Sequence, residues 1–184
     1  MPKDQPFAVN VSSSEVALSG MIWDVLRETF DFGDKPLTRE FVSHPGAVAV
    51  VAINDLGQVL MIRQYRHPVR KNLWELPAGL TDLPGESNLD AAKRELAEEA
   101  GLQAEHWQSL QTFHTTPGGN DESIEIFLAT ELSVVEIDFV REGEESDMQG
   151  RWVALDDALL SVQSSDIQNP AAVVAILALA HRVK

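Results

Sequence analysis

The chain has 184 residues, enough for one domain with a sizeable buried core. Its 44% apolar and 23% charged residues exclude a disordered or fibrous chain, and the lack of cysteine excludes disulfides, thiolate catalysis and zinc ribbons. A net charge of −15 disfavours nucleic acid and anionic membranes as partners, and it suits hard cations held by oxygen ligands.

Elements in the first half of the chain are predicted to be strands. Residues 1–13 form a loose, polar lead-in without a signal sequence. Strands are predicted over 16–26 and 36–42, around an acidic turn at 31–34. The apolar run 47–53 predicts a strand buried on both faces, and the turn signal after it predicts a hairpin with 58–65.

The second half begins with a predicted helix that has capping signals at both ends. Ser87 or Asn88 can cap its start, and Gly101 stands where a left-handed residue ends a helix. The elements expected beyond it are strands at 107–113, 123–130 and 151–155, a short helix capped by Asp156, and a terminal helix opened by Asn169-Pro170. The longest apolar stretch, 171–180, is too short to span a bilayer, so we expect a soluble, cytoplasmic protein of the α/β or α+β class.

The helix predicted after Ser87 carries three glutamates on one face. At about 100° per residue its core stripe is Leu89, Ala92, Leu96 and Ala100. Glu95, Glu98 and Glu99 fall on the other side at i, i+3 and i+4, where they repel one another and two of them oppose the helix dipole. A solvated acidic face is the common interpretation of such spacing, and a bound Mg²⁺ or Mn²⁺ is the functional one.

The residues around these glutamates favour the functional interpretation. They match the Nudix box, G-x5-E-x7-R-E-U-x-E-E-x-G-U with U apolar, at Gly79, Glu86, Arg94, Glu95, Leu96, Glu98, Glu99, Gly101 and Leu102. One extra residue separates Gly79 from Glu86, in a loop that tolerates insertion. Segments 38–48, 62–66 and 74–79 resemble the ADP-ribose pyrophosphatase branch of the Nudix hydrolases, and Pro117 stands where that branch also carries a proline.

This resemblance implies a fold and an assembly. The fold is the Nudix α/β/α sandwich with a mixed sheet, preceded by antiparallel N-terminal strands. Residues 1–43 would hold these strands and residues 44–184 the hydrolase domain. In this branch the N-terminal strands exchange between subunits, so a homodimer is expected.

The resemblance also implies site residues. Glu95 and Glu99 would be the main metal ligands, with Glu98 joining a second ion and the carbonyl of Ala78 as a further ligand. Glu86 would support the metal site, and Arg94 would orient the glutamates through a bidentate bond. The general base would come from the acidic segment 142–147, with Glu144 favoured and Glu145 second.

Substrate contacts implied by the resemblance each have a structural alternative. They are Arg39, Arg66, Glu75, Trp23 and Pro117, with Glu122 and Glu125 as weaker candidates. Arg39 and Arg66 could each instead form a cross-strand ion pair. Glu75 could be the buried partner of an arginine, and Trp23 could be a core or interface residue. Pro117 could mark a plain turn. The five histidines lack metal-ligand spacing and are read as structural or surface residues.

The implied reaction is Mg²⁺-dependent hydrolysis of ADP-ribose to AMP and ribose 5-phosphate. A nucleotide sugar or a dinucleotide is the nearest alternative substrate, because the box holds only metal and diphosphate. A non-catalytic, ligand-sensing Nudix domain is a more distant alternative, and the intact set of box carboxylates argues against it.

Overall fold

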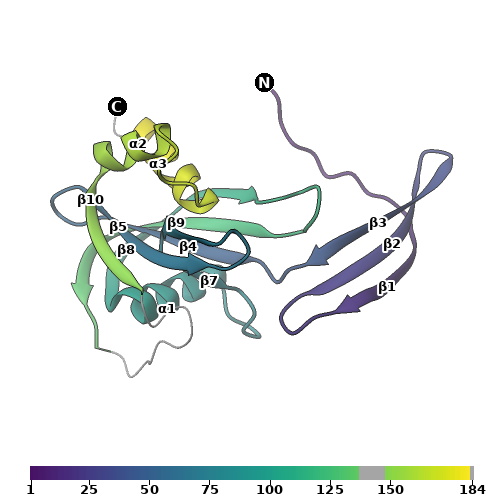
Figure 1. Ribbon diagram of the computed structural model, residues 1–184, viewed down its shortest axis with the longest axis horizontal. Helices are drawn as coiled ribbons and strands as arrows, with labels where there is room; N and C mark the ends of the chain where they lie inside the picture. Colours follow the sequence, from purple (N-terminus) through teal and green to yellow (C-terminus); the bar gives the residue numbers. More distant parts are fainter. Residues whose placement is uncertain (137–147, 183–184) are drawn as a thin grey trace. The chain divides into compact units, whose positions relative to one another are not determined.

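The structure is a computed structural model that describes residues 1–136 and 148–182. The chain divides into two compact units, each described by itself below. The smaller unit comprises Met1–His44 and His114–Glu122, and the larger comprises Pro45–Phe113 and Ser123–Lys184. Figure 1 labels their helices and strands.

The smaller unit contains an antiparallel sheet in the order β1-β2-β3. Its strands are β1 (Val11–Ser19), β2 (Asp24–Phe32) and β3 (Lys35–Ser43). The prediction of one strand over 16–26 was wrong, because a turn at 20–23 divides it and β1 begins within the expected lead-in. The Gly20 N–H donates to the Trp23 carbonyl at 3.0 Å, and a Cβ at position 20 would overlap that carbonyl. Glycine therefore permits the close approach that breaks the strand.

Strands of the larger unit form two sheets within the described residues. One has the order β7-β4-β9-β8 and is mixed, since β4 runs parallel to β9 and antiparallel to β7. Its strands are β4 (Ala47–Ala52), β7 (Ala78–Leu80), β8 (Leu102–His114) and β9 (Ser123–Val134). The other sheet has the order β10-β5-β6, formed by β5 (Gln58–Arg66), β6 (Lys71–Glu75) and β10 (Gln149–Ala154).

The predicted hairpin between 47–53 and 58–65 was therefore wrong, although both strands exist. β4 and β5 lie in different sheets and share only the isolated bridge between Ile53 and Val59. Both edges of β4 are occupied by β7 and β9, which leaves no edge for β5.

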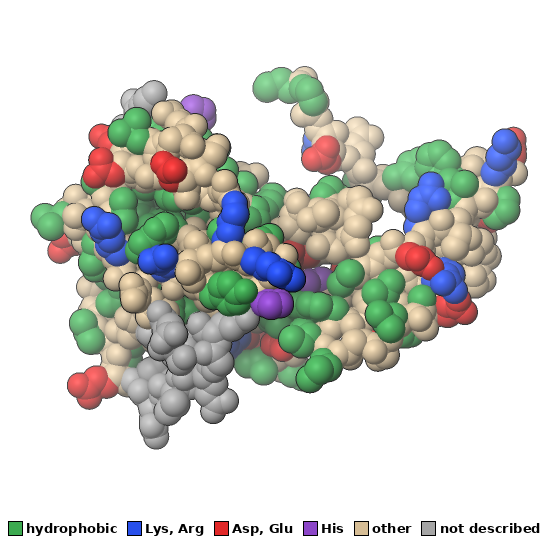
Figure 2. Space-filling model, viewed as in Figure 1, with side chains coloured by type: hydrophobic (Ala, Val, Ile, Leu, Met, Phe, Trp, Pro, Cys, Tyr) green, Lys and Arg blue, Asp and Glu red, His purple; other side chains and the backbone are tan. Residues whose placement is uncertain are grey.

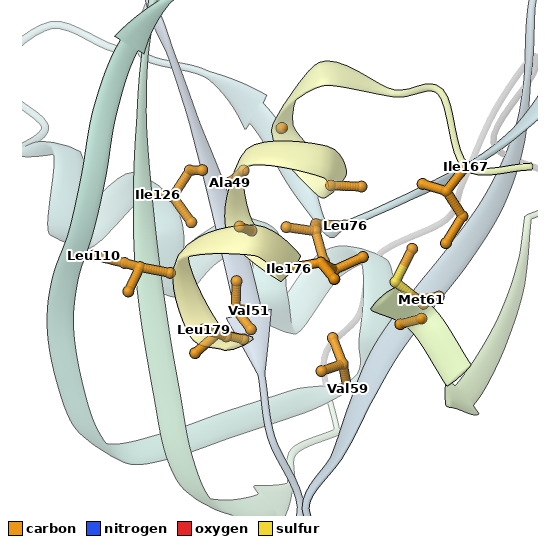
Figure 3. Packing of buried hydrophobic residues seen from close by; sticks show 14 of the residues in the cluster. Ala49, Val51, Val59, Met61, Leu76, Leu110, Ile126, Ile167, Ile176 and Leu179 are labelled. Atoms are coloured by element: carbon orange, nitrogen blue, oxygen red, sulfur yellow. The ribbon is translucent and has the colours of Figure 1, made fainter. Parts of the chain in front are cut away.

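Alternate side chains of β4 enter two separate cores, as the apolar run predicted. Val48 and Val50 pack with α1 (Asn88–Ala100), while Ala49 and Val51 pack with α2 (Leu155–Gln163) and α3 (Pro170–Arg182). Figure 1 shows α1 on one side of the strands and α2 and α3 on the other, and Figure 3 shows Leu179 of α3 by Val51 and Ile176 by Leu76. The predicted α/β/α sandwich is confirmed.

The helix ends test the capping predictions. Ser87 Oγ accepts the Asp90 N–H at 3.2 Å, and Gly101 follows α1 with φ 63°, as predicted. Asn169 Oδ1 accepts the Ala172 N–H at 3.1 Å, so the opening of α3 is also confirmed. Asp156 does not cap α2, because the helix begins one residue earlier and its N-cap is Ala154, which has no capping side chain. Among the described helices, none is long and apolar enough to cross a membrane.

Candidate active site

Arg94 of α1 is the centre of a cluster of carboxylates. Its guanidinium makes a bidentate contact with Glu86, from Nε at 2.9 Å and Nη2 at 3.0 Å. Its Nη1 donates to Glu95 at 2.5 Å and to Glu98 at 3.1 Å. The hydrogen bonds from Arg94 lower the pKa of Glu86, and the bond to Glu86 is the largest cause that raises the pKa of Arg94. Glu86 is therefore ionised at neutral pH, and Arg94 offsets its negative charge.

Glu95 and Glu99 do not lie on a solvated face. Both are buried, because β7 packs against the side of α1 that lies opposite the predicted core stripe. The Ala78 N–H of β7 donates to Glu99 Oε2 at 2.8 Å. A Cβ at Gly79 would overlap the carboxylate of Glu95, so Gly79 leaves room for that side chain. A buried carboxylate of this kind needs hydrogen-bond donors or a cation beside it.

The donor set fits a hard divalent cation by its chemistry. Glu95, Glu98 and Glu99 supply only carboxylate oxygens, the donors that Mg²⁺ prefers. Across residues 1–136 and 148–182, no three acidic or histidine side chains converge in a metal-binding arrangement. Glu95 and Glu98 contact Arg94 instead, and Glu99 contacts the Ala78 N–H. A divalent cation, when bound, would neutralise phosphate oxygens and polarise phosphorus.

Arg66 and Glu75 form a second charged pair, at the β5–β6 hairpin. Arg66 donates to Glu75 from Nε at 3.0 Å and from Nη2 at 2.7 Å. Glu75 is only 2% exposed, whereas the Arg66 side chain is 43% exposed. The geometry matches the alternative in which Glu75 is the buried partner of an arginine, and this partner fixes the guanidinium at the surface.

The smaller unit contains four further substrate candidates: Arg39, Trp23, Pro117 and Glu122. Arg39 donates to the Thr38 carbonyl at 2.8 Å, and the cross-strand ion pair considered for it is made by Arg27 and Glu40 instead. Pro117 lies in the loop 115–121, between β8 and β9. Trp23 stacks on His44, and His44 lies next to Glu122. This last grouping could not be predicted from the sequence, because its members are far apart in the chain.

Glu144 and Glu145, the candidate bases, lie outside the described residues. Glu125 accepts hydrogen bonds from Ser109 and Asn88, which ties β9 to β8 and to the start of α1. A cavity of about 220 Å³ lies against Glu99 and is lined by Leu60, Ile62, Ala100, Leu102, Gly150 and Trp152.

Comparison with known proteins shows the family and the fold of the chain. The NUDIX domain family matches residues 43–173. The chain is 43% identical over 168 residues to an ADP-ribose pyrophosphatase of Mycobacterium tuberculosis, covering 91% of this chain and 81% of that protein. It is 38% identical over 166 residues to an ADP-ribose pyrophosphatase of Bacillus subtilis, covering 89% and 88%. A crystal structure titled as an ADP compounds hydrolase has the same fold, with TM-score 0.82 and 20% identity over 98% of this chain and 97% of that one.

The family match and the two relatives show a hydrolase that acts on phosphate anhydrides. The chain belongs to the Nudix family, and it is a Nudix pyrophosphohydrolase. Members of this family generally use divalent metal ions.

Proposed function

We propose that this protein hydrolyses ADP-ribose to AMP and ribose 5-phosphate with Mg²⁺ as its cofactor. The hydrolytic half of the proposal depends on one observation, the cluster of Glu86, Glu95 and Glu98 around Arg94, with Glu99 of the same helix held by the Ala78 N–H. The substrate half is supported by the two relatives, each named as an ADP-ribose pyrophosphatase and aligned over about nine tenths of this chain.

The cofactor is proposed from the carboxylate cluster, and the base is proposed from the family resemblance of the acidic segment 142–147. Glu95, Glu98 and Glu99 would hold Mg²⁺ with the carbonyl of Ala78, and Mn²⁺ could replace it because it accepts the same oxygen ligands. Glu86 and Arg94 would keep these carboxylates oriented. Glu144, or else Glu145, would take the proton from the attacking water. On the substrate side Arg66 and Arg39 would bind phosphate, Glu75 would fix Arg66, and Trp23 with the Pro117 loop would contact the nucleoside.

The homodimer is proposed from the N-terminal sheet. β1 is an edge strand whose residues are all exposed, among them Val16 and Leu18, and Ile22 in the following turn is exposed as well. Figure 2 shows apolar side chains at the surface of this unit. An unpaired edge with apolar side chains is suited to pairing with a second copy of the chain. The composition favours the cytoplasm as the place where the dimer works.

The substrate is tested with a panel. Purified protein with Mg²⁺ receives ADP-ribose, ADP-glucose, diadenosine polyphosphates or oxidised nucleoside triphosphates, and a phosphatase releases phosphate from the products for detection. We expect ADP-ribose to give the highest kcat/KM. A higher kcat/KM for another member of the panel would overturn the substrate assignment while leaving the hydrolase class intact.

The metal ligands are tested with a matched pair of variants. Glu99→Gln keeps the shape of the side chain but removes its charge, so we expect it to fold and to lose most activity. Glu105→Gln is the same chemical change at an exposed site on β8 and should leave activity unchanged. Near-normal turnover by Glu99→Gln at saturating Mg²⁺ would contradict the ligand assignment.

A further inference from the structure

An aromatic stack lies within the smaller unit. The rings of Trp23 and His44 are 4.4 Å apart between centroids, with an angle of 21° between their planes. Trp23 lies in the turn between β1 and β2, and His44 follows the end of β3. The side chain of His44 is only 8% exposed, while Trp23 is half-buried. The imidazole thus covers one face of an indole that is still reached by solvent.

His44 is held in place from the loop before β9. Its Nε2 lies 3.3 Å from Glu122 Oε1, and its backbone N–H donates to Asp121 Oδ1 at 2.7 Å. The other carboxylate oxygen of Glu122 accepts the Thr115 hydroxyl at 2.5 Å. Glu122 is therefore itself fixed at both oxygens, and the orientation of the imidazole is determined by contacts that do not involve Trp23.

The backbone of the indole is fixed independently. Gly20 donates to the Trp23 carbonyl across the turn, and Ser19 Oγ donates to Asp24 Oδ1 at 2.8 Å. With its backbone set by the turn and one ring face set by His44, Trp23 has little rotamer freedom left to lose. Ordering a side chain before a ligand arrives reduces the entropy cost of binding.

We propose that His44, held by Glu122, is a positioning residue that orients Trp23 so that the ring face turned away from His44 stacks on the adenine base of the substrate. The inference rests on the proposed function, in which Trp23 contacts the nucleoside. Purine rings stack on indole faces with little dependence on other contacts, so a preset indole provides a binding surface for a base. His44 acts through Trp23 and does not touch the base itself.

Direct binding of AMP and of ribose 5-phosphate separates the base from the rest of the substrate. In calorimetric titrations we expect His44→Ala to weaken AMP about three- to tenfold, the range that one aromatic stack supplies. Ribose 5-phosphate, which lacks the base, should bind His44→Ala and the wild type equally. With ADP-ribose as substrate, KM should rise by the same factor and kcat should be unchanged.

Two further variants divide the role of His44. His44→Phe keeps a flat ring against Trp23 but loses the contact with Glu122, so it should restore part of the AMP affinity. Glu122→Gln leaves the imidazole in place with a weaker anchor and should have a smaller effect than His44→Ala. His106→Ala, the same change at an exposed histidine on β8, is the control and should bind AMP normally.

A double-mutant cycle decides whether His44 works through the indole. If it does, His44→Ala should have no further effect on AMP binding in a Trp23→Ala background. Additive effects would overturn the proposal, as would equal weakening of AMP and ribose 5-phosphate, or a wild type that does not bind AMP. The proposed function fails separately, if the wild type binds AMP but another member of the substrate panel is hydrolysed with a higher kcat/KM than ADP-ribose.

Discussion

Arg94→Gln tests whether one guanidinium holds the carboxylate cluster of α1 together. Arg94 contacts Glu86, Glu95 and Glu98, and glutamine can replace only one of those contacts. Glutamine has a helix propensity close to that of arginine, so the change acts on the cluster and not on the helix itself. The variant leaves three carboxylates close together without the cation between them.

The cost follows from how far water reaches the cluster. Breaking a fully buried ion pair costs about 3–5 kcal/mol, and an exposed pair contributes about 0–1 kcal/mol. The Arg94 side chain is 25% exposed, so solvent screens part of the interaction and we expect a loss of about 2–3 kcal/mol. For a chain of this size, that loss lowers the melting temperature by about 5–10 °C.

Thermal unfolding followed by circular dichroism, in EDTA and in Mg²⁺, measures the effect. The loss should be largest in EDTA and smaller in Mg²⁺, because a bound cation would replace the missing positive charge. Lys93→Gln on the same helix is the control, since Lys93 is 49% exposed and 3.7 Å from Asp90, and it should stay within about 0.5 kcal/mol of the wild type. Arg94→Gln melting within about 2 °C of the wild type in EDTA would refute the role of Arg94, and a loss that Mg²⁺ does not reduce would refute the cation site.

Three other substitutions test neighbouring features. Gly79→Ala places a Cβ in the space of the Glu95 carboxylate, so steady-state kinetics should show kcat reduced by about tenfold or more with the fold retained, and unchanged kcat would contradict the close packing. Arg94 lowers the pKa of the Glu86 carboxyl, so this carboxyl stabilises the folded state above the ordinary carboxyl pKa and loses that effect as pH falls. Glu86→Gln removes this pH-dependent contribution. Chemical denaturation should therefore show a smaller loss of stability between pH 7 and about pH 3 in Glu86→Gln than in the wild type, and an equal loss would contradict the pairing. Gly101→Ala forces a side chain into φ 63° and should cost about 1–2 kcal/mol in urea unfolding, whereas a neutral effect would contradict the left-handed cap.

The ends of α1 could be predicted because their signals are local. Ser87 and Gly101 act on backbone groups within a few residues of themselves, so a short window of sequence contains the whole interaction. The relation between β4 and β5 could not be predicted in this way. The turn between them is present, but β4 pairs with β7 and with β9, and β9 lies more than seventy residues further along the chain. Which strands pair with β4 depends on segments far away in the sequence, and a local pattern does not include them.

Contacts between distant residues also limited what could be predicted for the substrate candidates of the smaller unit. Trp23 could be named from its type and its place near a strand end, and its contact with His44 could not. The pair between His44 and Glu122 joins residues 78 positions apart without any periodicity that links them. Histidine without ligand spacing was therefore interpreted as structural, and its contact with an aromatic ring gives it a role that only the fold reveals.

The carboxylates of α1 show how the helix and the site depend on one another. Its last turn contains Glu98 and Glu99 and no basic residue, an arrangement that the helix dipole disfavours. Two groups offset this charge: Arg94, one turn earlier, contacts Glu98, and the Ala78 N–H of β7 contacts Glu99. Both groups also set the orientation of the carboxylates, so the contacts that stabilise the helix are those that would prepare it for a cation. A substitution that disturbs the geometry of this cluster should consequently lower stability as well as activity, whereas a substitution on the exposed face of α1 should change neither.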